Sequence, residues 1–164
     1  QYVEPTGRYA HFLDDPWAEL PEREPLNDEV TVAFIGGGFA GLVTGAKLKQ
    51  AGIDDVRIIE KGGDVGGTWY WNRYPGARFD SESYSYGYSF SQEILDEWDW
   101  SECFSGQPEI ERYCNLVADK FDLKKDIQFS ARVAAAHWQD DGGFWKVTRF
   151  CRSARPKRCW SMCE

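Results

Sequence analysis

The spacing of apolar and polar positions predicts a strand, a helix and a second strand in the first part of the chain. A short apolar run with two β-branched valines precedes a cluster of glycines and is typical of a buried strand: Val30, Val32, Ala33, Phe34 and Ile35. The spacing then becomes helical and predicts a helix of about three turns that ends at Gly52, with apolar positions at Leu42, Val43, Ala46 and Leu48. A second apolar run over 56–59 ends on Glu60, so residues 29–60 are predicted to form a β-α-β unit.

The later part of the chain predicts a longer helix and three further strands. Pro108 suits the first turn of a helix. Apolar residues then recur at helical spacing and are expected to belong to the core: Ile110, Tyr113, Val117 and Phe121. A shorter helical pattern covers 91–100. Strands are predicted at 127–129, 133–138 and 144–148, the last two joined by a hairpin turn at 140–143, and His137 on this hairpin is expected to be a surface or packing residue.

These elements predict an α/β fold class: an incomplete Rossmann-like domain with a small antiparallel hairpin. We expect three parts, which are an N-terminal extension at 1–28, the domain at 29–148 and a basic, cysteine-rich tail at 149–164. The extension is expected either to pack its aromatic residues irregularly on the domain or to be a partly disordered leader. The tail shows neither strand nor helical periodicity, and we interpret it as the product of a shifted reading frame. The alternative is a basic tail that binds nucleic acid or tethers the protein to a membrane.

The glycine cluster between strand and helix predicts a phosphate-binding turn. Gly36 permits a tight turn, Gly38 lets the backbone approach a pyrophosphate, and Gly41 lets the helix pack closely on the strand. The helix N-terminus supplies unpaired N–H groups. Glu60 lies 19 residues after Gly41, close to the ~20 expected for an acid that binds an adenosine ribose. The pattern therefore predicts a dinucleotide site, with an ordinary glycine-rich turn as the alternative, and it does not choose between FAD and NAD.

A stretch rich in glycine and aromatic residues follows the second strand. It runs from Lys61 to Phe90 and contains nine aromatic residues from Trp69 onward. The glycine pairs and the Pro75-Gly76 turn resemble no regular element, which predicts a long ordered loop, and such loops usually bind ligands. Flat side chains suit a large planar ligand. The alternative is an aromatic cluster that only caps the sheet.

Composition and charge narrow the function classes. The 164-residue chain is 42% hydrophobic and 16% aromatic, and no apolar stretch approaches a membrane span, so we expect a cytoplasmic protein. The formal net charge is -8, of which the last sixteen residues contribute +4 and the rest -12; an acidic body argues against nucleic acid as a partner. The five cysteines show no regular spacing, which predicts reduced thiols and no metal site.

The loop carries a resemblance to a known family. The stretch from Gly66 to Ser83, with Trp69-Tyr70-Trp71-Asn72-Arg73 at its centre, closely resembles the start of the Baeyer-Villiger monooxygenases acting on cyclic and aryl ketones. The resemblance extends over residues 30–148. It implies a flavoprotein that binds FAD and uses NADPH as a cosubstrate. The alternatives are another FAD- or NAD(P)-dependent oxidoreductase, or a non-catalytic dinucleotide-binding module.

The resemblance also implies roles for individual residues. Gly36, Gly38 and Gly41, with Ala40 beside them, would hold the FAD pyrophosphate, and Glu60 the adenosine ribose. Val133 would contact the adenine through its backbone. The flavin end would be lined by residues of the loop: Thr68, Trp69, Tyr70, Trp71, Asp80 and Tyr86. NADPH would approach the flavin at Arg78, Phe79 and Asp80; relatives often have a small residue or cysteine at position 79.

The reaction implied by the resemblance oxidises a ketone to an ester or lactone. NADPH reduces FAD, dioxygen adds to the flavin, and the flavin-bound oxygen attacks the ketone carbonyl. In relatives an aspartate at the position of Asp80 pairs with a catalytic arginine from a later part of the chain, which this sequence does not contain. We therefore expect a fragment that is inactive alone. A missing strand would leave an unpaired sheet edge and an exposed apolar face, which predicts poor solubility.

Overall fold

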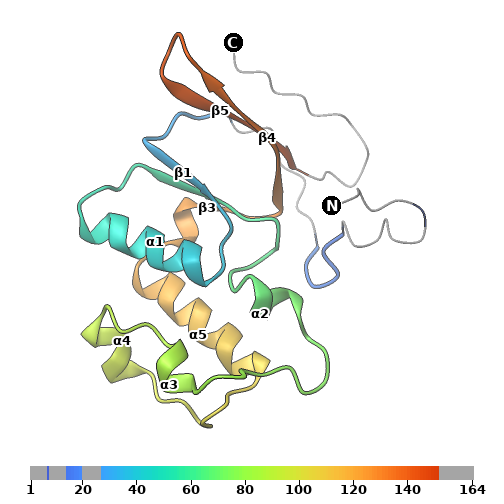
Figure 1. Ribbon diagram of the computed structural model, residues 1–164, viewed down its shortest axis with the longest axis vertical. Coiled ribbons are helices and arrows are strands. Elements are labelled where there is room, and N and C mark those ends of the chain that lie inside the picture. Colours follow the sequence, from blue (N-terminus) through green and yellow to red (C-terminus); the bar gives the residue numbers. More distant parts are fainter. Residues whose placement is uncertain (1–6, 8–13, 20–26, 152–164) are drawn as a thin grey trace.

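A three-stranded parallel sheet forms the centre of the protein. The computed structural model describes residues 7, 14–19 and 27–151. In this part of the chain the strands β1 (Val32–Ile35), β2 (Val56–Ile59) and β3 (Ile127–Gln128) lie in the order β1-β2-β3 (Figure 1). All neighbours are parallel, and Ile35 is in register with Ile59. The predicted β-α-β unit is confirmed.

Two helices, α1 (Phe39–Gln50) and α5 (Gln107–Lys120), pack against the sheet and against each other (Figure 1). Both were predicted, and Pro108 lies in the first turn of α5 as expected. The core between helices and sheet contains fully buried apolar side chains, among them Leu42, Ile58, Val117 and Leu123. Gly45 brings α1 close to β2, because a Cβ there would lie 3.3 Å from Cδ1 of Ile58.

The long segment between β2 and α5 contains more regular structure than its sequence predicts. It includes the one-turn helices α2 (Thr68–Trp71) and α3 (Ser83–Tyr86), where an irregular loop was expected, and the predicted helix α4 (Gln92–Glu97). The two short helices depend on distant contacts. α3 is held because Ser83 N–H donates to the carbonyl of Cys103 (2.7 Å) and the Ser83 hydroxyl contacts Ser105 Oγ (2.9 Å).

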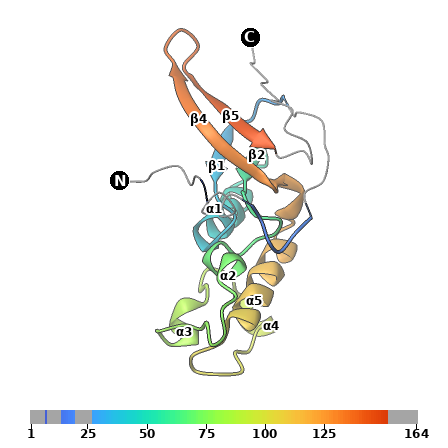
Figure 2. The same ribbon diagram turned by 90° about the vertical axis from the view of Figure 1, so that its right-hand side faces the viewer.

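A separate antiparallel hairpin follows β3 and the short 3-10 helix η2 (Lys124–Asp126). Its strands are β4 (Ala131–Gln139) and β5 (Phe144–Cys151). Both views show the hairpin projecting beyond the sheet (Figures 1 and 2). Its strands run further than predicted because they pair with each other along their whole length. β5 also continues past the predicted domain boundary at 148, whereas 152–164 lie outside the described residues.

Among the described segments, no helix combines the length and apolar character needed to traverse a lipid bilayer. The same residues contain no group of His, Cys, Asp and Glu arranged to hold a metal ion.

Candidate functional site

The glycine turn lies at the carboxyl end of β1, where it leads into α1. Gly36 has a φ of +103°, which favours glycine, and its N–H donates to the Ile59 carbonyl (2.9 Å). A Cβ at Gly41 would lie only 1.9 Å from the Gly36 carbonyl oxygen, so this position requires glycine. Helix α1 starts after Gly38 without a side-chain cap. The first N–H groups of the helix are therefore left for another acceptor, which suits a phosphate.

The carboxylate of Glu60 lies directly beside this turn. Glu60 follows the last residue of β2 and is only 4% exposed. One oxygen, Oε2, accepts a hydrogen bond from Gly37 N–H (2.5 Å), and the other, Oε1, accepts one from Gly62 N–H (2.6 Å). Because a buried carboxylate needs such donors, these bonds fix its position. The sequence predicted an acid near the turn but gave no sign of these two backbone contacts.

A second glycine pair docks the aromatic loop on the first turn. Gly66 N–H donates to the Gly37 carbonyl (3.0 Å), and a Cβ on Gly67 would lie 2.9 Å from the Gly38 Cα. Gly66 and Gly67 both have positive φ values, 122° and 56°. The backbone that approaches Gly38 closely is therefore, in part, that of Gly67. It places the start of α2, including the exposed Thr68, beside the N-terminus of α1.

Two of the predicted flavin residues, Trp69 and Tyr86, pack into an aromatic cluster with Phe79, which was predicted to lie where NADPH approaches. Trp69 and Phe79 are buried with Ile110, and Tyr86 packs on them with its ring centroid 4.1 Å from that of Phe79. Trp69 Nε1–H donates to the Tyr86 hydroxyl (3.2 Å). In this part of the loop the aromatic side chains pack within the protein, against Ile110 of α5 and not over the sheet. Phe79 is accommodated because the cluster surrounds it.

Tyr70 and Trp71 lie on other sides of α2. The Tyr70 ring packs on Gly62, whose added Cβ would lie 2.9 Å from Tyr70 Cε1, and its hydroxyl donates to Asp15 Oδ2 (2.7 Å). Burial, and then this bond to Asp15, raise the pKa of Tyr70, so the phenol stays protonated and acts as a donor. Trp71 is half-buried, with Lys61 Nζ 4.7 Å from its ring centroid.

The remaining predicted residues lie on the surface or on the hairpin. Ala40 is exposed in the first turn of α1. Arg78 and Asp80 are exposed, and Arg78 Nη1 contacts Glu102 Oε2 (3.0 Å) and the Phe104 carbonyl (2.9 Å). Val133 lies on β4 next to an irregularity in the register of the hairpin. The structure thus brings the glycines, Glu60 and the start of α2 together, and it leaves Arg78 and Asp80 open to solvent.

Comparison with known proteins shows which proteins this chain is similar to. Residues 35–95 match the family model described as NAD(P)-binding Rossmann-like domain. A Baeyer-Villiger monooxygenase of Streptomyces coelicolor is 43% identical over 150 residues, which are 90% of this chain and 24% of that protein. An acetone monooxygenase (methyl acetate-forming) of Gordonia sp. is 48% identical over 116 residues, 71% of this chain and 22% of that protein. The solved structure of OTEMO in complex with FAD and NADP matches with a TM-score of 0.70 and 46% identity, over 76% of this chain and 23% of that chain.

The chain is homologous to an N-terminal portion of Baeyer-Villiger monooxygenases. The family resemblance and the α/β, Rossmann-like fold class predicted from the sequence are confirmed. The chain spans about a quarter of the length of the curated relatives that it matches, 24% and 22% in the two named above. The roles assigned to individual residues stay predictions.

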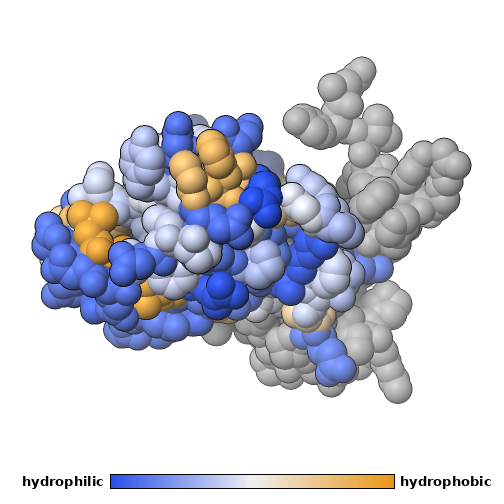
Figure 3. All heavy atoms as spheres, turned by 90° about the horizontal axis from the view of Figure 1, so that it is seen from below, coloured by the Kyte–Doolittle hydropathy of each residue, from blue (hydrophilic) through white to orange (hydrophobic). Residues whose placement is uncertain are grey.

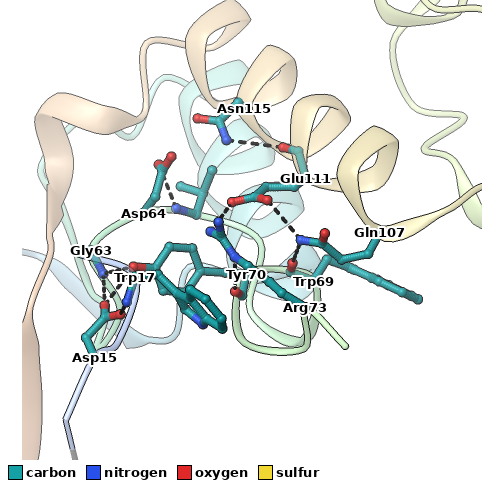
Figure 4. A network of polar contacts seen from close by, with 11 residues as sticks. Asp15, Trp17, Gly63, Asp64, Trp69, Tyr70, Arg73, Gln107, Glu111 and Asn115 are labelled. Carbon is teal, nitrogen blue, oxygen red and sulfur yellow. Dashed lines mark hydrogen bonds and ion pairs between the residues drawn. The ribbon is translucent and has the colours of Figure 1, made fainter. Parts of the chain in front are cut away.

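Sequence reasoning missed one set of residues beside the turn that follows Glu60. Asp15, Trp17, Gly63, Arg73 and Glu111 form a polar network around Tyr70 (Figure 4). Asp15 and Gly63 are 48 positions apart and belong to no shared motif. The only signal was the aromatic character of the N-terminal extension, which predicted packing on the domain but no partner.

Proposed function

We propose that this chain is the FAD-binding portion of a Baeyer-Villiger monooxygenase, which uses NADPH and O2 to oxidise a small ketone to an ester or lactone. The observation that carries the proposal is the buried Glu60 carboxylate, bonded to Gly37 N–H beside the uncapped N-terminus of α1. The names of the relatives support the reaction, since one of them is an acetone monooxygenase that forms methyl acetate. The segment alone is not expected to turn over.

The residues present fit a dinucleotide such as FAD. Each Glu60 oxygen accepts one backbone hydrogen bond, and a carboxylate oxygen can accept a second, which leaves capacity for the two ribose hydroxyls. The first turn of α1, around Ala40 and Gly41, offers N–H groups and a partial positive charge to the pyrophosphate. Gly36 and Gly38 keep side chains out of the space between turn and helix. Val133 would meet the adenine through its backbone.

The loop residues would act at the flavin end in two ways. Thr68 and Trp71 are not fully buried and would face the ring system. Trp69, Tyr70, Phe79 and Tyr86 would support that surface from behind, because they are packed together or hydrogen-bonded within the protein. Arg78 and Asp80, which are exposed, would meet NADPH and the remainder of the enzyme. FAD, when bound, supplies the electron transfer and oxygen chemistry, and these side chains bind and orient it.

The test is the binding of FAD to the purified chain. We expect quenching of flavin fluorescence on titration, and Glu60→Gln should weaken binding about tenfold, because the neutral amide loses charge-assisted bonds to the turn and to the ribose. Glu29→Gln is the matched control, since Glu29 is exposed and lies outside the site. The chain should show no ketone-dependent oxidation of NADPH. No binding at millimolar FAD, or equal affinities for both variants, would contradict the proposal.

A further inference from the structure

The described N-terminal segment 14–19 lies against the turn that follows Glu60 (Figure 4). Asp15 Oδ2 accepts two hydrogen bonds, one from Gly63 N–H (2.8 Å) and one from the Tyr70 hydroxyl (2.7 Å). Its other oxygen, Oδ1, accepts a hydrogen bond from Trp17 N–H (2.9 Å). A Cβ on Gly63 would lie 2.3 Å from the Ala18 Cβ, so the Gly63 backbone lies directly against the Ala18 side chain and leaves no room for a side chain of its own.

This contact is one peptide away from the Glu60 contact. The N–H of Gly62 bonds to Glu60, and the N–H of the next residue, Gly63, bonds to Asp15. Two carboxylates from distant parts of the chain therefore hold consecutive donors of one turn. Glu60 in turn bonds to Gly37 in the phosphate-binding turn. Hydrogen bonds, joined through the backbone between Gly62 and Gly63, therefore connect Asp15 with the glycine turn that we assign to FAD.

The other side of the segment is fixed by its tryptophan. The Arg73 guanidinium lies 5.0 Å from the Trp17 ring centroid and 5.1 Å from the Tyr70 ring centroid, so it contacts both rings. Arg73 Nη2 also bonds to Glu111 Oε1 on α5 (2.5 Å). The segment is thus attached to α2 and α5 as well as to the turn, and it braces the turn against the body of the domain.

We propose that Asp15 is a positioning residue for the ribose end of the dinucleotide site, acting through Gly63 and Tyr70 on the turn that orients Glu60. This inference rests on the proposed function, because it assumes that Glu60 binds the FAD ribose. Without Asp15, the Tyr70 hydroxyl loses its acceptor, and the Gly63 N–H keeps only its longer bond to the Tyr70 oxygen (3.2 Å). The turn then shifts to find water, and the Gly62 donor that fixes the Glu60 carboxylate shifts with it.

The test measures the affinities of FAD and of ADP for the full 164-residue chain and its variants. Asp15→Ala should weaken both ligands by the same factor, about tenfold, because the effect lies in the half of FAD that ADP shares. Asp15→Asn should restore most of the affinity, since its amide oxygen can accept both bonds. Glu19→Ala is the matched control: it removes the same charge from an exposed position of the same segment and should change neither affinity.

Two further measurements separate positioning from general destabilisation. Ultraviolet titration should show a lower pKa for Tyr70 in Asp15→Ala, because burial still raises the pKa but the additional effect of the Asp15 hydrogen bond is gone. Tyr70→Phe identifies the Tyr70 signal. The affinity losses of Asp15→Ala and Tyr70→Phe should not add in the double variant.

Three outcomes overturn the inference alone while the parent chain still binds FAD. They are unchanged affinities in Asp15→Ala, a loss confined to FAD with ADP unaffected, and losses that follow only the denaturation midpoint, with no recovery in Asp15→Asn. Absence of FAD binding by the parent chain would instead overturn the proposed function, and this inference with it.

Discussion

At the scale of single residues, the requirement for glycine is strictest at Gly41. The atom that a Cβ would meet 1.9 Å away is the Gly36 carbonyl oxygen, and it belongs to the backbone of the turn and cannot rotate aside. Gly45, one turn further along α1, differs: its Cβ would lie 3.2 Å from Cδ2 of Leu123, which is the end of a flexible side chain. Both positions are glycines of α1, but only Gly41 is held against backbone that cannot move aside.

We accordingly predict that Gly41→Ala lowers the free energy of unfolding by about 2–4 kcal/mol, since the turn must open to relieve the clash. Gly45→Ala should cost about 1 kcal/mol or less, because the gain in helix propensity offsets the tighter packing. Denaturant unfolding of the two variants measures the difference. Equal losses at both positions would show that the turn is not the limiting contact.

A second residue-scale prediction concerns Glu109 in the first turn of α5. Burial alone would raise its pKa, but hydrogen bonds from the backbone N–H (2.9 Å) and hydroxyl (2.8 Å) of Ser101 outweigh burial and hold the pKa below its ordinary value of 4.5. The folded state therefore binds this proton less readily than the unfolded state. The stabilisation is present above the ordinary pKa and is lost as the pH falls through the lowered one.

The measurement compares the free energy of unfolding of the parent chain with that of Glu109→Gln, from about pH 7 down to about pH 3. The parent should be the more stable at neutral pH, and the difference in free energy of unfolding should shrink in acid. In a Ser101→Ala background the difference in free energy of unfolding should be smaller at neutral pH, because the hydroxyl donor is removed. A difference that stays constant with pH would mean that Glu109 acts through packing alone.

At the scale of elements, those that depend on local spacing could be predicted from the sequence. The strand at Val32–Ile35 and the helix at Phe39–Gln50 followed from a change of apolar period, and α5 from Pro108 and its apolar stripe. Glu60 could be placed beside the turn because parallel strands bring their carboxyl ends to one edge of a sheet. These features are encoded within a few residues of where they appear.

The remainder depends on contacts between distant segments. Helix α2 forms where Gly67 packs on Gly38, and α3 where Ser83 bonds to the 103–105 turn, and neither partner is visible from the local sequence. The same holds for the bond between Asp15 and Gly63. The aromatic side chains were ambiguous for another reason: the features that suit a flavin also suit a packed core, and the sequence does not show that Trp69 and Phe79 are buried together.

The hairpin supplies a prediction at this scale. Trp138 and Trp145 face each other across β4 and β5 with ring centroids 5.5 Å apart and an interplanar angle of 62°, although they are 48% and 62% exposed. Trp145→Val should remove the coupled circular-dichroism signal of the pair and lower the stability of the hairpin by about 0.5–1 kcal/mol. Phe144→Leu, at the neighbouring position, should leave that signal in place. Its loss in both variants would assign the signal elsewhere.

At the scale of the whole molecule, apolar surface is distributed unevenly. Seen from the end formed by α3 and α4, the surface is mostly hydrophilic, with small separate apolar patches (Figure 3). The sheet is different. Ile35 and Ile59 are partners in register and so point to the same face, yet Ile59 is 3% exposed and Ile35 is 66% exposed. Within the described residues, other side chains therefore cover this face of the sheet at β2 but not at β1. In the same part of the chain, β1 pairs with another strand on one side only.

An uncovered strand edge with an exposed isoleucine favours association between copies of the chain, because parallel sheets are normally covered on both faces. We expect light scattering of the purified chain to rise with concentration. Ile35→Lys should reduce this association several-fold, since a charge on the exposed face of β1 cannot be buried against another copy without a partner. Ile53→Lys is the control, because Ile53 is also exposed but lies in the loop after α1, away from the edge. A parent chain that stays monomeric at all concentrations, or an equal response to both substitutions, would show that the β1 edge is not what drives association.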